Sequence, residues 1–252
     1  MGVGPGVTRW RFSGIASDDN EGRKLPAVQA ILAFAAALVA LRLAGALARR
    51  YYSRRTPALA AWAAGLAAYA LASAALAWGA AAGWDGRAFR AYYLFGGLLT
   101  APLLGAGSLL LAGRRWALPL ALAYSGLAVG IAVAVPLTAP VMGTSIPEAQ
   151  SHLDFFPARL VAVLGNSLGT LAVVSVALLT LRKRPLGNGL ILAGVGVAAA
   201  GSAVAGLGKT ESAAFIAVAA VLLYAGFLAA SGERPSIRLG LSSPSPRRRT
   251  AR

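Results

Sequence analysis

The chain has 252 residues, of which 58% are hydrophobic and only 13% are charged, and its mean hydropathy is +0.67. Soluble domains carry about a quarter charged residues, so this composition argues against a soluble protein and predicts helices that lie in lipid. The absence of cysteine excludes disulfides, thiolate catalysis and thiolate metal ligands. The formal net charge of +16 comes from basic residues dispersed among short segments and a tail, so we expect no nucleic-acid partner.

Charged residues fall in clusters along the chain, and the stretches between the clusters have the length of about 20 residues that a membrane-spanning helix needs. The predicted fold is therefore an all-α bundle of seven transmembrane helices in one domain, residues 26–231. The expected helices are residues 26–48, 58–82, 91–112, 117–139, 158–181, 186–207 and 212–231. Residues 1–25 are predicted to be a polar disordered tail, and residues 232–252 a basic disordered tail rich in Ser, Pro and Arg.

Prolines mark several expected helix ends and bends. Thr56 and Pro57 have the pattern of an N-cap followed by a first-turn proline, which predicts the start of the second helix. Pro102 is expected to kink the third helix, and Pro136 and Pro140 to kink or end the fourth. A proline inside a helix frees a backbone carbonyl, which in a membrane must face protein or a cavity.

The distribution of basic residues predicts the orientation. Of the 24 lysines and arginines, fifteen lie on the side of the C-terminal tail and eight on the other side, which also holds seven of the eight carboxylates. The positive-inside rule places the fifteen in the cytoplasm, and an odd number of spans then places the N-terminus outside. We therefore expect a multi-pass protein of the cell membrane with a cytoplasmic C-terminus.

Some arginines are candidates for contact with lipid headgroups. Arg42 lies within the first predicted helix, where its long side chain can reach the headgroups, and a functional anion contact is the alternative. In the tail, Arg247, Arg248 and Arg249 are expected to contact anionic lipid, with disorder that serves no function as the alternative.

No Asp, Glu, His or Lys lies within any predicted span, which argues against proton relays, retinal attachment and haem ligation in the bilayer. We predict no catalytic residue, no metal and no cofactor. Polar side chains at similar depth in the predicted bundle form a candidate ligand cavity: Tyr69, Tyr92, Tyr93, Thr100, Asn166 and Thr170. Asn166 is the one carboxamide well inside a span, and the carbonyl of Leu98, freed by Pro102, is its expected acceptor.

A second candidate site lies in the predicted outer loops, where a polar or metal-binding cluster would form if the second and fourth loops approach each other. Its members are Asp85, Glu148, His152 and Asp154. The alternative is a solvated loop. Elsewhere, small residues recur four apart and predict close helix packing, in the third helix at Gly97, Ala101 and Gly105 and in the sixth at Gly194, Ala198, Ser202 and Gly206.

A series of short motifs lies between residues 54 and 115. They are Arg54-Arg55-Thr56-Pro57 followed by Ala61-Trp62, Gly83-Trp84, Phe89-Arg90 with Tyr92-Tyr93-Leu94-Phe95-Gly96, and Leu104-Gly105-x-Gly107-Ser108. This pattern resembles uncharacterised seven-helix membrane proteins of actinobacteria and, more distantly, the seven-helix sensor regions that precede histidine kinases. The resemblance implies a sensor or accessory role.

Three functions remain open from the sequence. The leading hypothesis is a non-enzymatic membrane protein of sensor or accessory type that binds a small or lipidic ligand in the outer half of the bundle. A transporter for a neutral or apolar solute is the second, and a membrane enzyme that uses the outer loop is the third. The expected partners are the lipid bilayer, anionic headgroups on the cytoplasmic side, and a membrane-protein partner or a second copy of the chain.

Overall fold

The computed structural model describes residues 18–206 and scattered helical positions between 215 and 229. Its elements are all helical, with no β-strand among the described residues, so the predicted all-α fold is confirmed. Within the described part of the chain, five helical stretches are long and apolar enough to cross a membrane, namely Ala30–Arg54, Pro57–Ala82, Gly86–Leu111, Ala117–Ala134 and Phe155–Thr180. The seventh predicted helix, residues 212–231, lies mostly outside the described residues, as do the predicted tail residues 1–17 and 232–252.

The first two helices form a long antiparallel pair joined by a tight turn. Helix α1 (Asp18–Arg54) begins eight residues before the predicted start at Pro26. Helix α2 (Pro57–Ala82) starts where the proline predicts, although the hydroxyl of Thr56 makes no capping hydrogen bond.

The third membrane crossing consists of three helical segments in one continuous path: α3 (Gly86–Tyr92), a π-helical segment, η1 (Tyr93–Leu99), and α4 (Thr100–Leu111). The crossing starts at Gly86, where the sequence predicted a turn as far as Arg90, because Asp85 caps it. Its Oδ1 accepts hydrogen bonds from the backbone N–H of Arg87 (3.0 Å) and of Ala88 (2.7 Å). These are two of the donors that a helix start leaves without an intrahelical partner.

Helix α5 (Ala117–Ala134) ends five residues before the predicted position 139. Val135 has an extended backbone, as expected for a residue that precedes proline, here Pro136. A loop with one short helix, α6 (Ala149–His152), leads to the π-helical turn η2 (Phe155–Arg159) and to α7 (Leu160–Thr180). Helix α8 (Pro185–Gly206) follows, and its stretch Pro185–Val197 is apolar but shorter than a full span.

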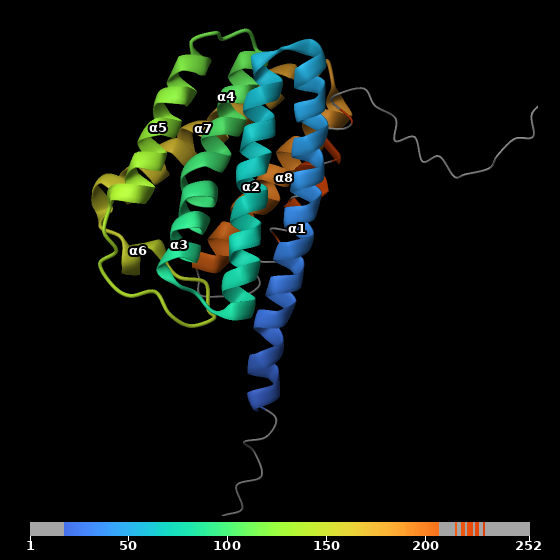
Figure 1. Ribbon diagram of the computed structural model, residues 1–252. Coiled ribbons are helices and arrows are strands. Elements are labelled where there is room, and N and C mark those ends of the chain that lie inside the picture. The colour runs from blue at the N-terminus through green and yellow to red at the C-terminus, as the bar shows by residue number, and fades with distance from the viewer. Residues whose placement is uncertain are drawn as a thin grey trace, which may run out of the picture.

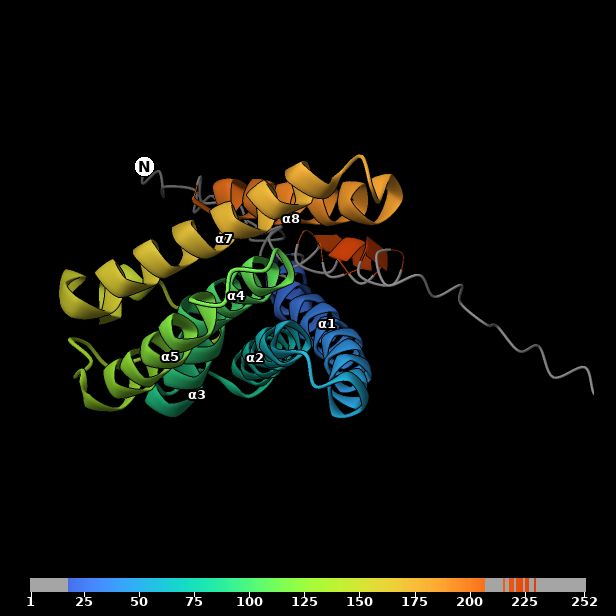
Figure 2. The same ribbon diagram turned by 90° about the horizontal axis from the view of Figure 1, so that it is seen from above.

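The helices run side by side, with α1 packed on α2, α2 on α4 and α4 on α7 (Figure 1). Viewed from above, α7 and α8 lie on one side of the bundle and α1, α2, α4 and α5 on the other (Figure 2). Small residues allow these contacts, as the sequence predicted for the third crossing. A Cβ placed on Gly105 would lie 2.6 Å from the backbone of Gly169, and one on Gly65 would lie 3.0 Å from Leu104. On α8, a Cβ on Gly194 would lie 2.9 Å from Leu223.

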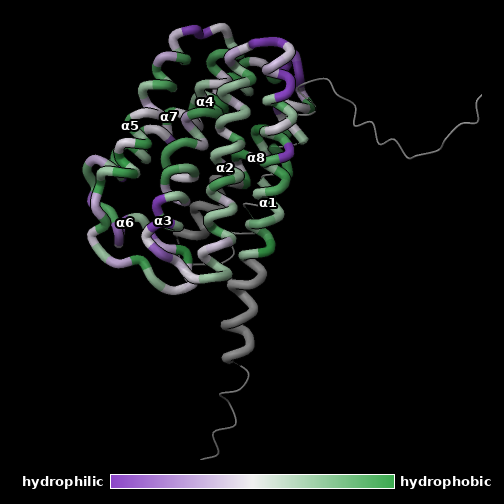
Figure 3. Tube along the Cα trace, viewed as in Figure 1, coloured by the Kyte–Doolittle hydropathy of each residue, from purple (hydrophilic) through white to green (hydrophobic). Residues whose placement is uncertain are grey.

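The surface of the bundle carries many exposed hydrophobic side chains. Large hydrophobic side chains are exposed along the helices, among them Trp78 (65% exposed) and Leu179 (82% exposed). Hydrophilic residues concentrate at the two ends, in the turns between α1 and α2 and between α4 and α5 at one end and around α3 and α6 at the other (Figure 3). Exposed apolar surface on this scale needs lipid or protein to cover it.

Candidate ligand-binding groove

Asn166 lies in the second turn of α7 and reaches across to the third crossing, as the sequence predicted, but to a different carbonyl. Its Nδ2 donates to the backbone oxygen of Gly97 at 2.6 Å, so the predicted acceptor Leu98 is wrong by one residue. Gly97 belongs to the π-helical segment η1. Its N–H groups pair five residues back, as the N–H of Thr100 does with the oxygen of Phe95.

Pro102, in α4, has no N–H, so neither the carbonyl four residues before it, that of Leu98, nor the carbonyl five residues before it, that of Gly97, can receive a hydrogen bond from this residue. Asn166 donates to the second of these carbonyls. The carboxamide therefore finds within the bundle an acceptor that hydrocarbon would not provide.

The other predicted cavity residues occupy several separate places. Thr100 Oγ1 donates to the oxygen of Phe95 at 2.7 Å, within its own helix. Tyr69 forms a side-chain hydrogen bond with Ser73, one turn further along α2, whereas Tyr92 packs edge-on against Trp84 with a ring-centroid distance of 5.4 Å. Thr170 is exposed on the surface of α7.

Two tyrosine hydroxyls lie near the start of α7. Tyr93 is buried and stacks on Phe89 with a ring-centroid distance of 6.0 Å, and among the described residues its hydroxyl has no hydrogen-bond partner. Tyr124, on α5, donates its hydroxyl to the backbone oxygen of Val161 at 3.2 Å. Arg159 lies close enough to Tyr93 to interact with it electrostatically.

The second and fourth loops approach each other, which was the condition for the predicted outer-loop cluster. The N–H of Trp84 donates to the oxygen of Gly143 at 2.7 Å. Asp85, however, uses its carboxylate to cap α3, so this side chain serves the local backbone.

The other members of that cluster also make local contacts. Glu148 Oε2 accepts a hydrogen bond from Gln150 Nε2 at 2.7 Å. His152 packs edge-on against Phe89 with a ring-centroid distance of 5.4 Å, and Asp154 is exposed. Within the described ranges, no three His, Asp or Glu side chains are grouped so that they could hold a metal ion.

Of the arginines predicted to contact headgroups, Arg42 is exposed on the outer surface of α1, whereas Arg247, Arg248 and Arg249 lie outside the described residues. The exposure of Arg42 leaves its side chain room to extend along the helix.

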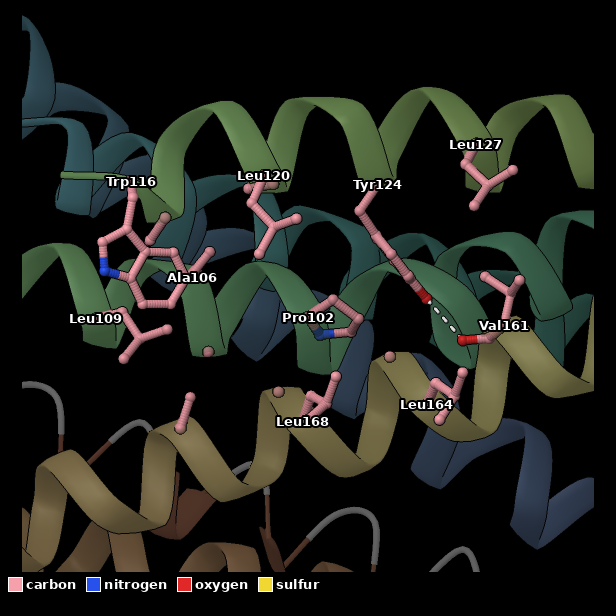
Figure 4. Close-up of a pocket in the computed structure, with 16 residues that line it drawn as sticks. Pro102, Ala106, Leu109, Trp116, Leu120, Tyr124, Leu127, Val161, Leu164 and Leu168 are labelled. Carbon is pink, nitrogen blue, oxygen red and sulfur yellow. Dashed lines mark hydrogen bonds between the residues drawn. The ribbon is translucent and has the colours of Figure 1, made fainter. Parts of the chain in front are cut away.

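An apolar groove lies between α5 and α7 with α4 as its floor, and its volume is about 280 Å³ (Figure 4). Its walls are hydrocarbon except for the Trp116 indole and the Tyr124 hydroxyl. The lining residues are Pro102, Gly105, Ala106, Leu109, Trp116, Ala117, Leu120, Ala121, Tyr124, Leu127, Val161, Leu164, Gly165, Leu168, Gly169 and Ala172. None of the six residues of the predicted cavity is among them.

Tyr124 sets the distance between α5 and α7. Its hydroxyl bonds to α7 at Val161, and its ring lies against Gly165, where an added Cβ would overlap the phenol (Figure 4). On the floor, Gly105 and Gly169 bring α4 and α7 into backbone contact. The groove is therefore the space left beside a close α4–α7 contact when a tyrosine side chain separates α5 from α7.

Sequence reasoning missed this groove because it searched for polar side chains at equal depth. The available signal was a set of glycines four apart, Gly165 and Gly169, that faces the predicted smooth side of the third helix at Gly105. Such a pattern indicates close packing of α4 and α7. It does not show that the neighbouring helix α5 lies further from α7.

Comparison of the chain with protein-family models, curated proteins and solved structures finds no match. In the part of the chain that the structure describes, all elements are helical, five helical stretches are long and apolar enough to cross a membrane, and an apolar groove lies between three of the helices.

Proposed function

We propose that this protein is a non-enzymatic, multi-pass protein of the cell membrane, of sensor or accessory type, that binds an apolar or lipidic ligand in the groove between α4, α5 and α7. The observation that carries the proposal is the groove, about 280 Å³ in volume and lined almost entirely by hydrocarbon. Sites for small molecules are typically concave and mostly apolar, with few polar groups. The ligand site thus moves from the predicted polar residues to this apolar surface.

The hypothesis of a sensor depends on which helices the ligand would contact. An occupant of the groove contacts α5 through Leu120 and α7 through Leu168 at the same time. Its affinity therefore depends on the spacing of these helices, and a ligand shifts a conformational equilibrium by its difference in affinity for the two states. The groove thus couples ligand binding to helix position.

The finer topology is part of the proposal. Seven helices, with the N-terminus outside and the C-terminus in the cytoplasm, agree with the fifteen-to-eight division of basic residues.

A transporter for a neutral or apolar solute is the second candidate, and the interruption of the third crossing favours it. The π-helical segment η1 and Pro102 lie beside the groove, and interrupted helices often form the binding sites of transporters. Uptake of an apolar solute into sealed vesicles would distinguish the two, because a sensor binds without flux.

Quenching of Trp116 fluorescence tests the groove. The full chain is placed in vesicles of phosphatidylcholine with brominated acyl chains. The fluorescence of Trp116 is obtained by subtracting the fluorescence of the Trp116→Phe variant from that of the parent. Ala121→Phe, which adds a ring to the groove wall, should reduce the quenching of Trp116. The control is Trp78, which is 65% exposed on α2 and does not line the groove. Equal quenching of Trp116 in the parent and in Ala121→Phe would refute binding in the groove.

A further inference from the structure

The two ends of the groove differ in charge. At one end Trp116, 56% exposed, forms part of the wall, and Arg114 and Arg115 immediately precede it in the exposed turn between α4 and α5. Arg49 and Arg54 lie in the last two turns of α1, at the same hydrophilic end of the bundle (Figure 3).

The carboxylates of the described residues lie toward the opposite end. Asp85 precedes α3, and Glu148 and Asp154 flank α6. The basic end of the groove therefore has positive charge without a carboxylate from the described residues to neutralise it. The far end has both positive and negative charges, because Arg159, the last residue of η2, is five residues after Asp154 in the chain.

The interior of the groove excludes polar ligand groups. Its one hydroxyl, that of Tyr124, already donates to Val161. A polar group buried among the remaining hydrocarbon would lose its hydration without gaining a partner. An occupant that suits both the interior and the basic end is therefore a molecule with a hydrocarbon body and an anionic head.

We propose that the ligand of the groove is an anionic phospholipid, with one acyl chain along α5 and α7 and its phosphodiester headgroup at Arg114 and Arg115. This inference rests on the proposed function and names the class of ligand for that same site. Arginine suits the headgroup because its planar guanidinium forms paired, charge-assisted hydrogen bonds with phosphate oxygens. Trp116 lies between the two regions, and indoles favour the boundary between headgroups and hydrocarbon.

The test uses vesicles in which a minor fraction of the lipid is brominated, either phosphatidylglycerol or phosphatidylcholine. Brominated phosphatidylglycerol should quench Trp116 at a lower mole fraction than brominated phosphatidylcholine. The expected preference is about fivefold for each arginine, since a basic residue near an anionic lipid surface contributes about this factor. Arg114→Gln/Arg115→Gln should abolish the preference and leave quenching by phosphatidylcholine unchanged.

The control is Arg49→Gln/Arg54→Gln, which removes the same charge from the same end of the bundle without altering the turn before Trp116. It should retain the preference, and an equal loss in both double variants would show a general surface-charge effect and overturn the inference. A brominated fatty acid that quenches as well as phosphatidylglycerol would overturn the phosphodiester assignment.

The failure of this inference is distinguishable from that of the proposed function. Equal quenching by the two phospholipids, with the effect of Ala121→Phe retained, would overturn the anionic headgroup and leave groove binding intact. Loss of the Ala121→Phe effect with every lipid would overturn both.

Discussion

The hydrogen bond from Asn166 to Gly97 provides the sharpest test of the packing described here. Asn166→Leu removes the side-chain donor of the Gly97 carbonyl, which lies five residues before Pro102, a residue without an N–H. Leaving a buried acceptor unpaired costs about 1 to 3 kcal/mol, whereas polar contacts between membrane helices average about 0.6 kcal/mol and reach about 1.7. Because the bond is short, at 2.6 Å, and joins α7 to η1, we expect a loss of about 1 to 1.5 kcal/mol.

A double-mutant cycle separates this hydrogen bond from general packing. Pro102→Ala restores an N–H that can pair with the helix carbonyls, so Asn166→Leu should cost clearly less in that background. The expected coupling energy is about 0.5 to 1 kcal/mol, within the usual range for residues that share one network. The free energies of unfolding of the parent, the two single variants and the double variant are measured by denaturant titration in the same detergent.

Ser167→Leu is the matched control, because Ser167 is the next residue on α7 and is exposed. It should change the free energy of unfolding little. A coupling energy of zero between positions 166 and 102 would show that the hydrogen bond of Asn166 does not depend on the missing N–H of Pro102, and would refute this prediction. A Ser167→Leu loss as large as that of Asn166→Leu would show that leucine on α7 destabilises for another reason.

The remaining predictions concern packing, capping and topology. Gly107→Ala should lower the free energy of unfolding by about 1 to 3 kcal/mol, because the added Cβ would overlap the indole of Trp62. Gly130→Ala should be neutral or slightly stabilising, because open space surrounds Gly130. Thermal melting in detergent compares the two variants. Asp85→Ala should cost about 1 kcal/mol through loss of the α3 cap, and Asp85→Asn should retain most of that stability in the same assay. With no native cysteine, a cysteine at position 145 should react with an impermeant reagent on intact cells and one at position 53 should not, and the reverse pattern would overturn the proposed orientation.

The positions of the five candidate membrane-spanning helices could be predicted approximately from the sequence because the constraint is local. A helix that crosses lipid must satisfy its own backbone and present apolar side chains over its whole length. The second crossing was therefore located to within one residue at Pro57, since the proline fixes the first turn. The errors occurred at caps: Asp85 starts α3 five residues before the predicted position 91, because a carboxylate that accepts two backbone N–H groups extends a helix into what reads as a turn.

The contact partner of Asn166 shows the limit of reasoning from one helix. The sequence indicates that Pro102 frees a carbonyl and that a carboxamide at similar depth would pair with it. It does not reveal that residues 93–99 form the π-helical segment η1, nor that the carbonyl that Asn166 reaches is that of Gly97 and not that of Leu98. Which carbonyl faces α7 depends on how the two helices pack.

By itself, then, the sequence determined the all-helical membrane character, the approximate helix boundaries and the need for Asn166 to point into the bundle, because each follows from the chemistry of a single segment in hydrocarbon. The tertiary structure alone decided where a ligand could bind. The groove exists because Gly105 and Gly169 bring α4 and α7 into contact while Tyr124 separates α5 from α7. Such a space depends on the relative positions of three helices that are distant in sequence, and no local pattern encodes those positions.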